Sequence, residues 1–219
     1  MTHLRTVAEQ AARFAEGFGG AELAHYVGLW HDLGKFNPRF QEYLFRCEAD
    51  LKAKGSGPEH KAAGAQLCRQ SLGPLSLLVH GHHGGLKTPT ELEKWLGERK
   101  KDPALQHSLE LARREVPDLV PPTRPAMPPH VRDPLAAEFF MRMLFSALVD
   151  ADHLDTEAHF NAGKSALRGT DVGLGELSER FERHQREVAG DGEGTVNRVR
   201  REVYEACLVA AKQPTHIPQ

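Results

Sequence analysis

Apolar residues recur three and four positions apart along most of the chain, which is the spacing of one buried face of an α-helix. Glycine and proline interrupt this pattern where helices are expected to end or begin. No stretch alternates apolar and polar residues convincingly enough to indicate a strand. The pattern therefore predicts an all-α, single-domain helical bundle, with helices near residues 4–18, 21–33, 38–51, 59–71, 75–82, 88–116 (one or two helices), 135–160, 174–188 and 195–212.

The helix expected at 135–160 is the most hydrophobic of these. It is apolar almost all round, which is typical of a central, fully buried helix. Asp150 and Asp152 interrupt it, and a buried carboxylate is costly unless it is paired or bound to a metal. We expect one of the two to be a ligand, but periodicity does not choose between them, since both sides of the helix are apolar.

The length of 219 residues and the hydrophobic content of 40% predict one domain over residues 1–219 with a sizeable core. A proline-rich segment at 117–134 resembles a domain boundary in composition. We interpret it as a long internal loop, because candidate ligands lie on both sides of it. The C-terminal helix near 195–212 is expected to belong to the same domain.

Composition excludes several classes of protein. The formal net charge is −2 with acidic and basic residues mixed, so a site for a polyanion must be local or metal-based. The cysteines Cys47, Cys68 and Cys207 are far apart without Cys-x-x-Cys spacing, which argues against a thiolate zinc site and indicates a reducing cytosol, hence a cytoplasmic location. We expect no signal peptide, and no apolar run is long enough to span a membrane.

Residues 29–36 read Leu-Trp-His-Asp-Leu-Gly-Lys-Phe and place an imidazole beside a carboxylate at an expected helix end. Adjacent helical residues point about 100° apart, but in a last turn before a glycine stop His31 and Asp32 can both lean toward one ion. This nitrogen and oxygen pair suits zinc, manganese, nickel or iron, and Lys35 can hold a phosphate oxygen beside the metal. A buried, hydrogen-bonded histidine in a C-capped helix is the simpler alternative.

The chain contains 13 histidines, and several occupy positions like that of His31. One lies at the edge of the first apolar helix face, one beside a line of small residues, and two in a Gly-His-His-Gly-Gly segment that ends a short helix. The inward-facing candidates are His3, His31, Asp32, His60, His82, His83 and one of Asp150 and Asp152. So many ligands exceed the need of one tetrahedral ion and suit two ions bridged by a carboxylate such as Asp32. Two ions about 3.5–4 Å apart can activate water and hold the leaving oxygen of a phosphodiester.

The ordered set of motifs resembles the HD phosphohydrolase superfamily, and more closely the HD nuclease domain of the CRISPR-associated helicase–nuclease of type I systems. The segments that carry the resemblance are 3–9, 30–36, 59–64, 81–85 and 148–157. The resemblance implies an α-helical HD fold with two divalent ions, from among Mn, Ni, Fe, Co and Mg. It gives the ligand positions to His3, His31, Asp32, His60, His82, His83 and Asp152, with Asp150 in reserve. It makes Asp32 and Lys35 catalytic and implies that Lys35 and Ser146 line the substrate site.

The activity implied by the resemblance is metal-dependent cleavage of single-stranded DNA, namely the strand displaced when a guide RNA pairs with its target. The implied partners are single-stranded DNA, an RNA-guided CRISPR surveillance complex and a superfamily-2 helicase in cis or in trans. The sequence has no Gly-x-x-x-x-Gly-Lys-Ser/Thr loop, so we expect no helicase motor within it. It reads as a stand-alone subunit or as a fragment cut at the junction with the helicase.

Two other functions stay open at this point. A nucleotide or cyclic-nucleotide phosphohydrolase of the same superfamily shares the His-Asp pair but needs a closed pocket for a base. A helical scaffold that uses metal only to hold its fold would share the ligands and turn over no phosphodiester. His3 stands close to the end of the sequence, and fraying of residues 1–5 would remove one ligand from the first ion.

Overall fold

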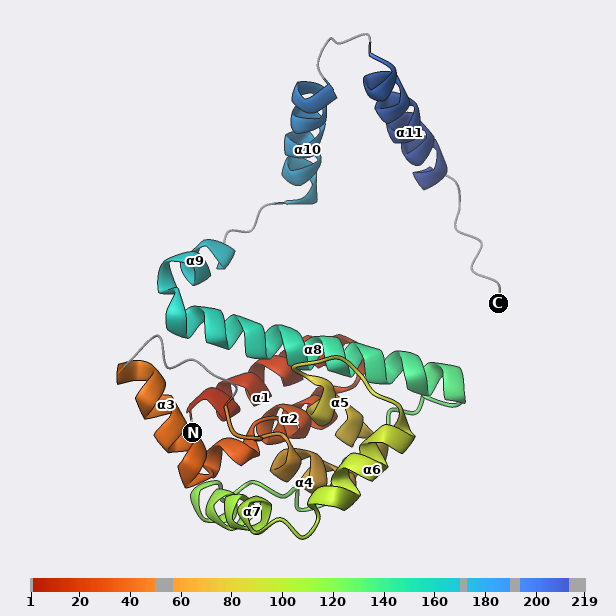
Figure 1. Cartoon of the computed structure of the whole chain (residues 1–219). Coiled ribbons are helices and arrows are strands. Elements are labelled where there is room, and N and C mark those ends of the chain that lie inside the picture. Colours follow the sequence, from red (N-terminus) through yellow and green to blue (C-terminus); the bar gives the residue numbers. More distant parts are fainter. Residues whose placement is uncertain (1, 50–56, 170–172, 190–193, 213–219) are drawn as a thin grey trace. The chain divides into compact units, whose positions relative to one another are not determined.

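The computed structural model describes residues 2–49, 57–169, 173–189 and 194–212. Every regular element in these ranges is a helix or a short 3-10 turn, and none is a strand (Figure 1). The predicted all-α class is therefore confirmed. None of the described helices combines the length and the apolar character that crossing a membrane requires.

The chain divides into two compact units by its internal contacts, Met1–Ala166 and Leu167–Gln219. The first unit carries every residue singled out above for the site. The second contains α10 (Leu174–Ala189) and α11 (Thr195–Ala211), whose apolar residues are exposed within that unit. A single domain over residues 1–219 stays a prediction.

Three helices form the centre of the first unit: α1 (Thr2–Ala15), α2 (Ala21–Trp30) and α8 (Pro134–Phe160). α1 and α2 pack side by side, and α8 lies across both (Figure 1). The core that they share is almost entirely aliphatic. Among its fully buried side chains are those of Val7, Val27, Leu29, Leu144 and Leu148.

Smaller helices surround this centre on its other side (Figure 1). Their bounds are Pro38–Ala49 for α3, Ala62–Leu72 for α4, Ser76–Gly81 for α5, Pro89–Arg99 for α6 and Pro103–Glu115 for α7. The short helix α9 (Ala162–Ala166) follows the end of α8 instead (Figure 1). Side-chain caps define several of the starts. The expected start of α3 is confirmed, because Asn37 Oδ1 accepts a hydrogen bond from the Arg39 N–H at 2.9 Å and proline takes the first helical position. Residues 50–51 of that expected helix lie outside the described part of the chain.

Helix α8 differs from the expectation that it is buried all round. Its inner side is buried at Phe140, Leu144 and Leu148, but Leu135 is 77% exposed and Phe139 is 65% exposed. α1, α2 and α5 pack against this helix within the first unit, and they cover one side of it only. Apolar composition alone cannot reveal a one-sided helix when the outer side is apolar too.

The proline-rich connector runs between α7 and α8 without forming a helix. It begins on the core, where Leu119 is buried and its carbonyl oxygen accepts a hydrogen bond of 2.8 Å from the indole N–H of Trp30. Trp30 is fully buried at the end of α2. The connector thus stabilises the helix end that carries the His-Asp pair.

A close backbone approach brings α4 against the end of α2. A Cβ atom added to Gly64 would lie 1.7 Å from the carbonyl oxygen of Trp30, far inside van der Waals contact. Only glycine allows the two backbones to meet there. Because of this contact, α4 and the segment before it lie close to the residues that follow Trp30.

We predict that Gly64→Ala lowers the free energy of unfolding by at least about 1–3 kcal/mol, because α2 and α4 must move apart. Gly97→Ala is the matched control: Gly97 is an exposed glycine in α6 with open space around the Cβ position. It should raise stability by up to about 1 kcal/mol through helix propensity. Urea unfolding measures both, and equal effects of the two variants would contradict the close contact.

Candidate metal centre

The His-Asp pair lies where helix geometry ends. α2 ends at Trp30, His31 still has helical dihedrals, and Asp32 leaves the helical region with φ −121° and ψ 24° before a 3-10 turn over Leu33–Phe36. Both side chains are completely buried. Because the backbone changes course between them, they reach the same point, as predicted for a helix end.

Gly34 acts differently from the expected helix stop. Positive φ angles occur at Gly19, Gly73 and Gly85 among the described residues, and Gly34 has none. Its N–H donates a 2.9 Å hydrogen bond to the His60 carbonyl oxygen, and a Cβ atom at Gly34 would lie 2.1 Å from that oxygen. Gly34 is therefore needed for the close approach of the segment before α4, which carries His60 to Asp32.

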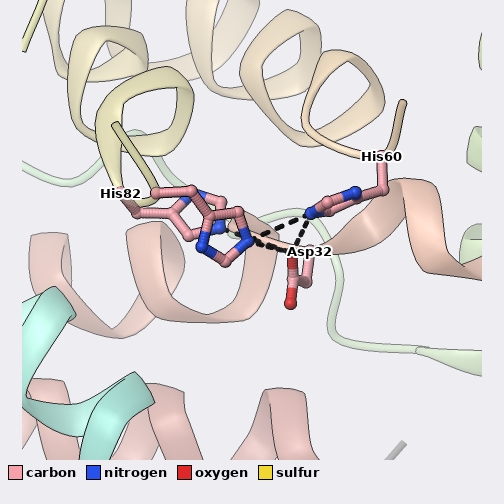
Figure 2. A group of neighbouring side chains, drawn as sticks. Asp32, His60 and His82 are labelled. Atoms are coloured by element: carbon pink, nitrogen blue, oxygen red, sulfur yellow. Dashed lines mark hydrogen bonds and ion pairs between the residues drawn. The ribbon is translucent and has the colours of Figure 1, made fainter. Parts of the chain in front are cut away.

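One oxygen of the Asp32 carboxylate faces three histidines (Figure 2). The Nε2 atoms of His82, His60 and His83 lie 3.4, 3.5 and 3.9 Å from Asp32 Oδ1. His60 comes from the segment before α4, and the other two follow the end of α5. The Nε2 atoms of His60 and His83 are 3.1 Å apart. These four side chains form the first candidate metal group, called group A.

The other oxygen of Asp32 faces a second set of ligands. Asp32 Oδ2 lies 3.3 Å from His31 Nε2 and 3.8 Å from His3 Nε2. Asp152 Oδ1 lies 3.4 Å from His3 Nε2 and 3.7 Å from His31 Nε2. His3, His31 and Asp152 form the second candidate metal group, called group B. Asp32 thus stands between the two groups with one oxygen toward each.

Backbone carbonyls orient three of these imidazole rings. The Nδ1 atoms of His31, His82 and His60 lie 2.6, 2.6 and 3.2 Å from the carbonyl oxygens of Gly28, Val79 and Pro58. A carbonyl can only accept, so each Nδ1 carries a proton, and Nε2 is the ring nitrogen that is directed toward Asp32. A second ring nitrogen held in this way is typical of histidines that bind metals.

Several polar atoms at the centre are buried without a hydrogen-bond partner among the described residues. They are His31 Nε2, His82 Nε2 and both carboxylate oxygens of Asp32. Buried polar atoms are normally satisfied, and these atoms converge on one carboxylate, where the ammonium of Lys35 is ion-paired with Asp32 Oδ2. Such a convergence indicates a site for cations. Imidazole nitrogens and carboxylate oxygens without thiolates fit divalent ions. The two groups together fit a binuclear site.

Charge within group B is strongly coupled. Burial alone would lower the pKa of each imidazole, but the carboxylates of Asp152 and Asp32 outweigh it and raise the pKa of His3 to about 10 and that of His31 to about 9. The same contacts hold the pKa values of both carboxylates below their usual range in spite of burial.

Group A has the opposite tendency. Burial lowers the pKa of His60, and burial together with the neighbouring His82 lowers the pKa of His83 to about 4. These two imidazoles are therefore neutral at physiological pH, so binding a cation requires no net loss of a proton from them. The two sides of the Asp32 carboxylate therefore differ in protonation. His3 and His31 must lose a proton before they bind a cation, whereas His60 and His83 are already neutral.

The structure gathers most of the predicted residues and leaves two outside. Lys35 pairs with Asp32 through its ammonium group. Asp152 is buried and faces the histidines of group B, whereas Asp150 is exposed. Ser146 is exposed on α8, six residues before Asp152, and therefore points about 120° away from Asp152 around the helix axis. The geometry gives no support to Ser146 as a residue of the site.

Sequence reasoning missed Asp155. Its Oδ2 atom accepts a hydrogen bond of 2.5 Å from His3 Nδ1–H, so it orients the His3 ring as the carbonyls orient the others. Asp155 stands three residues after Asp152, on the same face of α8. This spacing from Asp152 is the feature of the sequence that indicates a place for Asp155 beside the site. The bond also ties the first turn of α1 to α8, which opposes the fraying that the sequence left open for His3.

In this all-helical domain, a His-Asp pair and histidines from other segments surround one shared carboxylate. This arrangement defines the HD class of metal-binding domains. The sequence pattern of the family described as "Cas3, HD domain" matches residues 2–150, more than half of the chain. The chain therefore belongs to the Cas3 HD domain family and is a metal-dependent nuclease. No match to the chain is found among curated proteins.

We predict that metal binding near pH 7.5 releases about two protons, because cations displace those on His3 and His31. Affinity for Mn²⁺ should accordingly rise from pH 6.5 to pH 9. In the metal-free protein the raised pKa values stabilise the fold fully below the unfolded value of about 6.5, and this stabilisation is lost as pH rises through 9 to 10.

Calorimetric titration with Mn²⁺ in buffers of different ionisation enthalpy measures the released protons. Asp150→Ala is the control variant, since Asp150 is exposed outside both groups. Heats that do not depend on the buffer would contradict the protonated state of group B.

Proposed function

We propose that this chain cleaves single-stranded DNA, as the nuclease of a type I CRISPR interference system, and that its substrate is the strand displaced by guide pairing. The observation that carries the proposal is the placement of the Asp32 carboxylate. Each of its oxygens faces a separate set of imidazole nitrogens, at 3.3–3.9 Å. A carboxylate shared in this way supports a pair of ions rather than one.

The proposed ligands are His60, His82 and His83 for one ion, His3, His31 and Asp152 for the other, and Asp32 between them. When bound, two divalent ions polarise a phosphodiester and make water a stronger nucleophile. The histidine-rich donor set favours Mn, Fe, Co or Ni over Mg, which prefers oxygen ligands. The family match adds nuclease chemistry to this ligand set.

Lys35 is the proposed phosphate-binding residue. Its ammonium group pairs with Asp32 Oδ2, and its side chain is partly exposed at the edge of the buried centre. From this position Lys35 can meet a phosphate that reaches the ions and can neutralise charge that develops on it. Its backbone is held by Gln41, whose side-chain amide donates a 2.6 Å hydrogen bond to the Lys35 carbonyl oxygen.

The near-neutral charge of the chain supports delivery of DNA by a partner. With a formal net charge of −2, the chain has little general attraction for a polyanion. A superfamily-2 helicase in cis or in trans, recruited by an RNA-guided surveillance complex, would supply an unwound strand. The proposed division of labour places motor and nuclease in separate domains.

We predict that His31→Ala and Asp32→Ala each reduce cleavage of single-stranded DNA at least about 100-fold with Mn²⁺ or Ni²⁺, because each removes a ligand at the centre. Asp150→Ala should cleave at the wild-type rate. Gel-based cleavage of a labelled oligonucleotide measures the effect, and circular dichroism verifies that each variant is folded.

Three results would contradict the proposal. Unchanged cleavage by both ligand variants would place the chemistry elsewhere. Turnover of free nucleotides or cyclic nucleotides without DNA cleavage would favour the phosphohydrolase alternative. Loss of the fold on metal removal, with no turnover of any phosphodiester by the loaded protein, would favour a metal-stabilised scaffold.

A further inference from the structure

A cavity of about 560 Å³ opens beside the candidate metal centre, within the first unit of the chain. His3, Asp32 and Lys35 line it, so it reaches both the shared carboxylate and the proposed phosphate-binding lysine. The same cavity is lined by apolar side chains of α3 and of the last turns of α8. Its volume is in the range of pockets that hold small ligands. Neither the metal ligands nor Lys35 account for the apolar part.

The end of α8 supplies one apolar wall. Thr156, His159 and Phe160 line the cavity and share one face of the helix, at positions i, i+3 and i+4. Phe160 is 81% exposed, although an aromatic ring of this size is usually buried. The rings of Phe160 and His159 pack nearly perpendicular to each other, with centroids 4.8 Å apart.

The segment from Lys35 to α3 supplies the other apolar wall, through Phe36 and Leu44. Leu44 is 38% exposed. Phe160 stands five residues after Asp155, about 7.5 Å further along the axis of α8. An aromatic ring and aliphatic side chains therefore line the same cavity as Lys35, the proposed phosphate-binding residue.

From this juxtaposition we infer that Phe160 is a stacking platform for a nucleobase next to the scissile phosphate, with Leu44 and Phe36 forming the remaining apolar wall of this base subsite. The inference rests on the proposed function, and it names the part of the substrate that the cavity holds. Only an unpaired strand presents a free base face to such a platform, because bases in a duplex are stacked on each other. The subsite thus selects single strands while it tolerates any base.

The test compares two phenylalanines on the same helix. Phe160→Ala should raise KM for a single-stranded oligonucleotide about 10-fold, the usual effect of losing one aromatic–base stack, with a smaller change in kcat. Phe139→Ala is the matched control, since Phe139 is also largely exposed on α8 and does not line the cavity. It should leave KM within about twofold of wild type. Phe160→Trp should restore binding.

A second substrate separates stacking from a general structural effect. On an oligonucleotide with abasic sites throughout, wild type and Phe160→Ala should have the same KM, because no base remains to stack. Equal losses on both substrates, or equal effects of the two alanine variants, would overturn the inference.

Binding measured by fluorescence anisotropy keeps this test independent of cleavage. If wild type binds single strands but fails to cut them, the proposed function fails, whereas a 10-fold weaker affinity of Phe160→Ala still supports the subsite. If wild type cuts and Phe160→Ala binds as tightly as wild type, the subsite fails and the nuclease stands.

Discussion

A buried carboxylate between two sets of imidazoles governs this structure. Asp32 is completely buried, and a charged group in that position is costly unless opposite charges or cations surround it. Without metal, protonated His31 and His3 partly supply that charge on one side, and the ammonium of Lys35 adds to it. On the other side the imidazoles of His60 and His83 are neutral, because burial lowers the pKa of each. That side depends most on a cation to balance the carboxylate.

The fold is arranged so that separate segments can meet at this carboxylate. The first turn of α1, the end of α2, the segment before α4, the residues after α5 and the middle of α8 each contribute a ligand candidate. Two glycines make the approach possible because they lack a side chain. The His60 backbone packs against Gly34, and the Trp30 backbone packs against Gly64. Backbone proximity at these points is as much a part of the site as the ligands themselves.

Much of this arrangement could be predicted from the sequence. Helical periodicity predicted the helices. Helix ends pointed to His31, His82 and His83, because such ends can direct neighbouring side chains to one point. His3 was singled out at the edge of an apolar helix face, and His60 beside a line of small residues. Periodicity did not choose between Asp150 and Asp152, since apolar residues lie on both sides of that helix, and the choice of Asp152 came from the family resemblance. The role of Gly34 and the exposed side of α8 depend on tertiary neighbours that no local pattern encodes. The pairing of Asp155 with His3 could not be predicted from local spacing, because the two residues are 152 positions apart.

The central claim is that one carboxylate serves two ions held by two distinct groups. Metal content of the purified, manganese-loaded protein, measured by inductively coupled plasma mass spectrometry on ligand variants, tests it most directly. The account predicts two ions per chain in wild type, one in His83→Ala, one in Asp152→Ala and none firmly held in Asp32→Ala. A single ion in wild type, or two ions retained by folded Asp32→Ala, would contradict it.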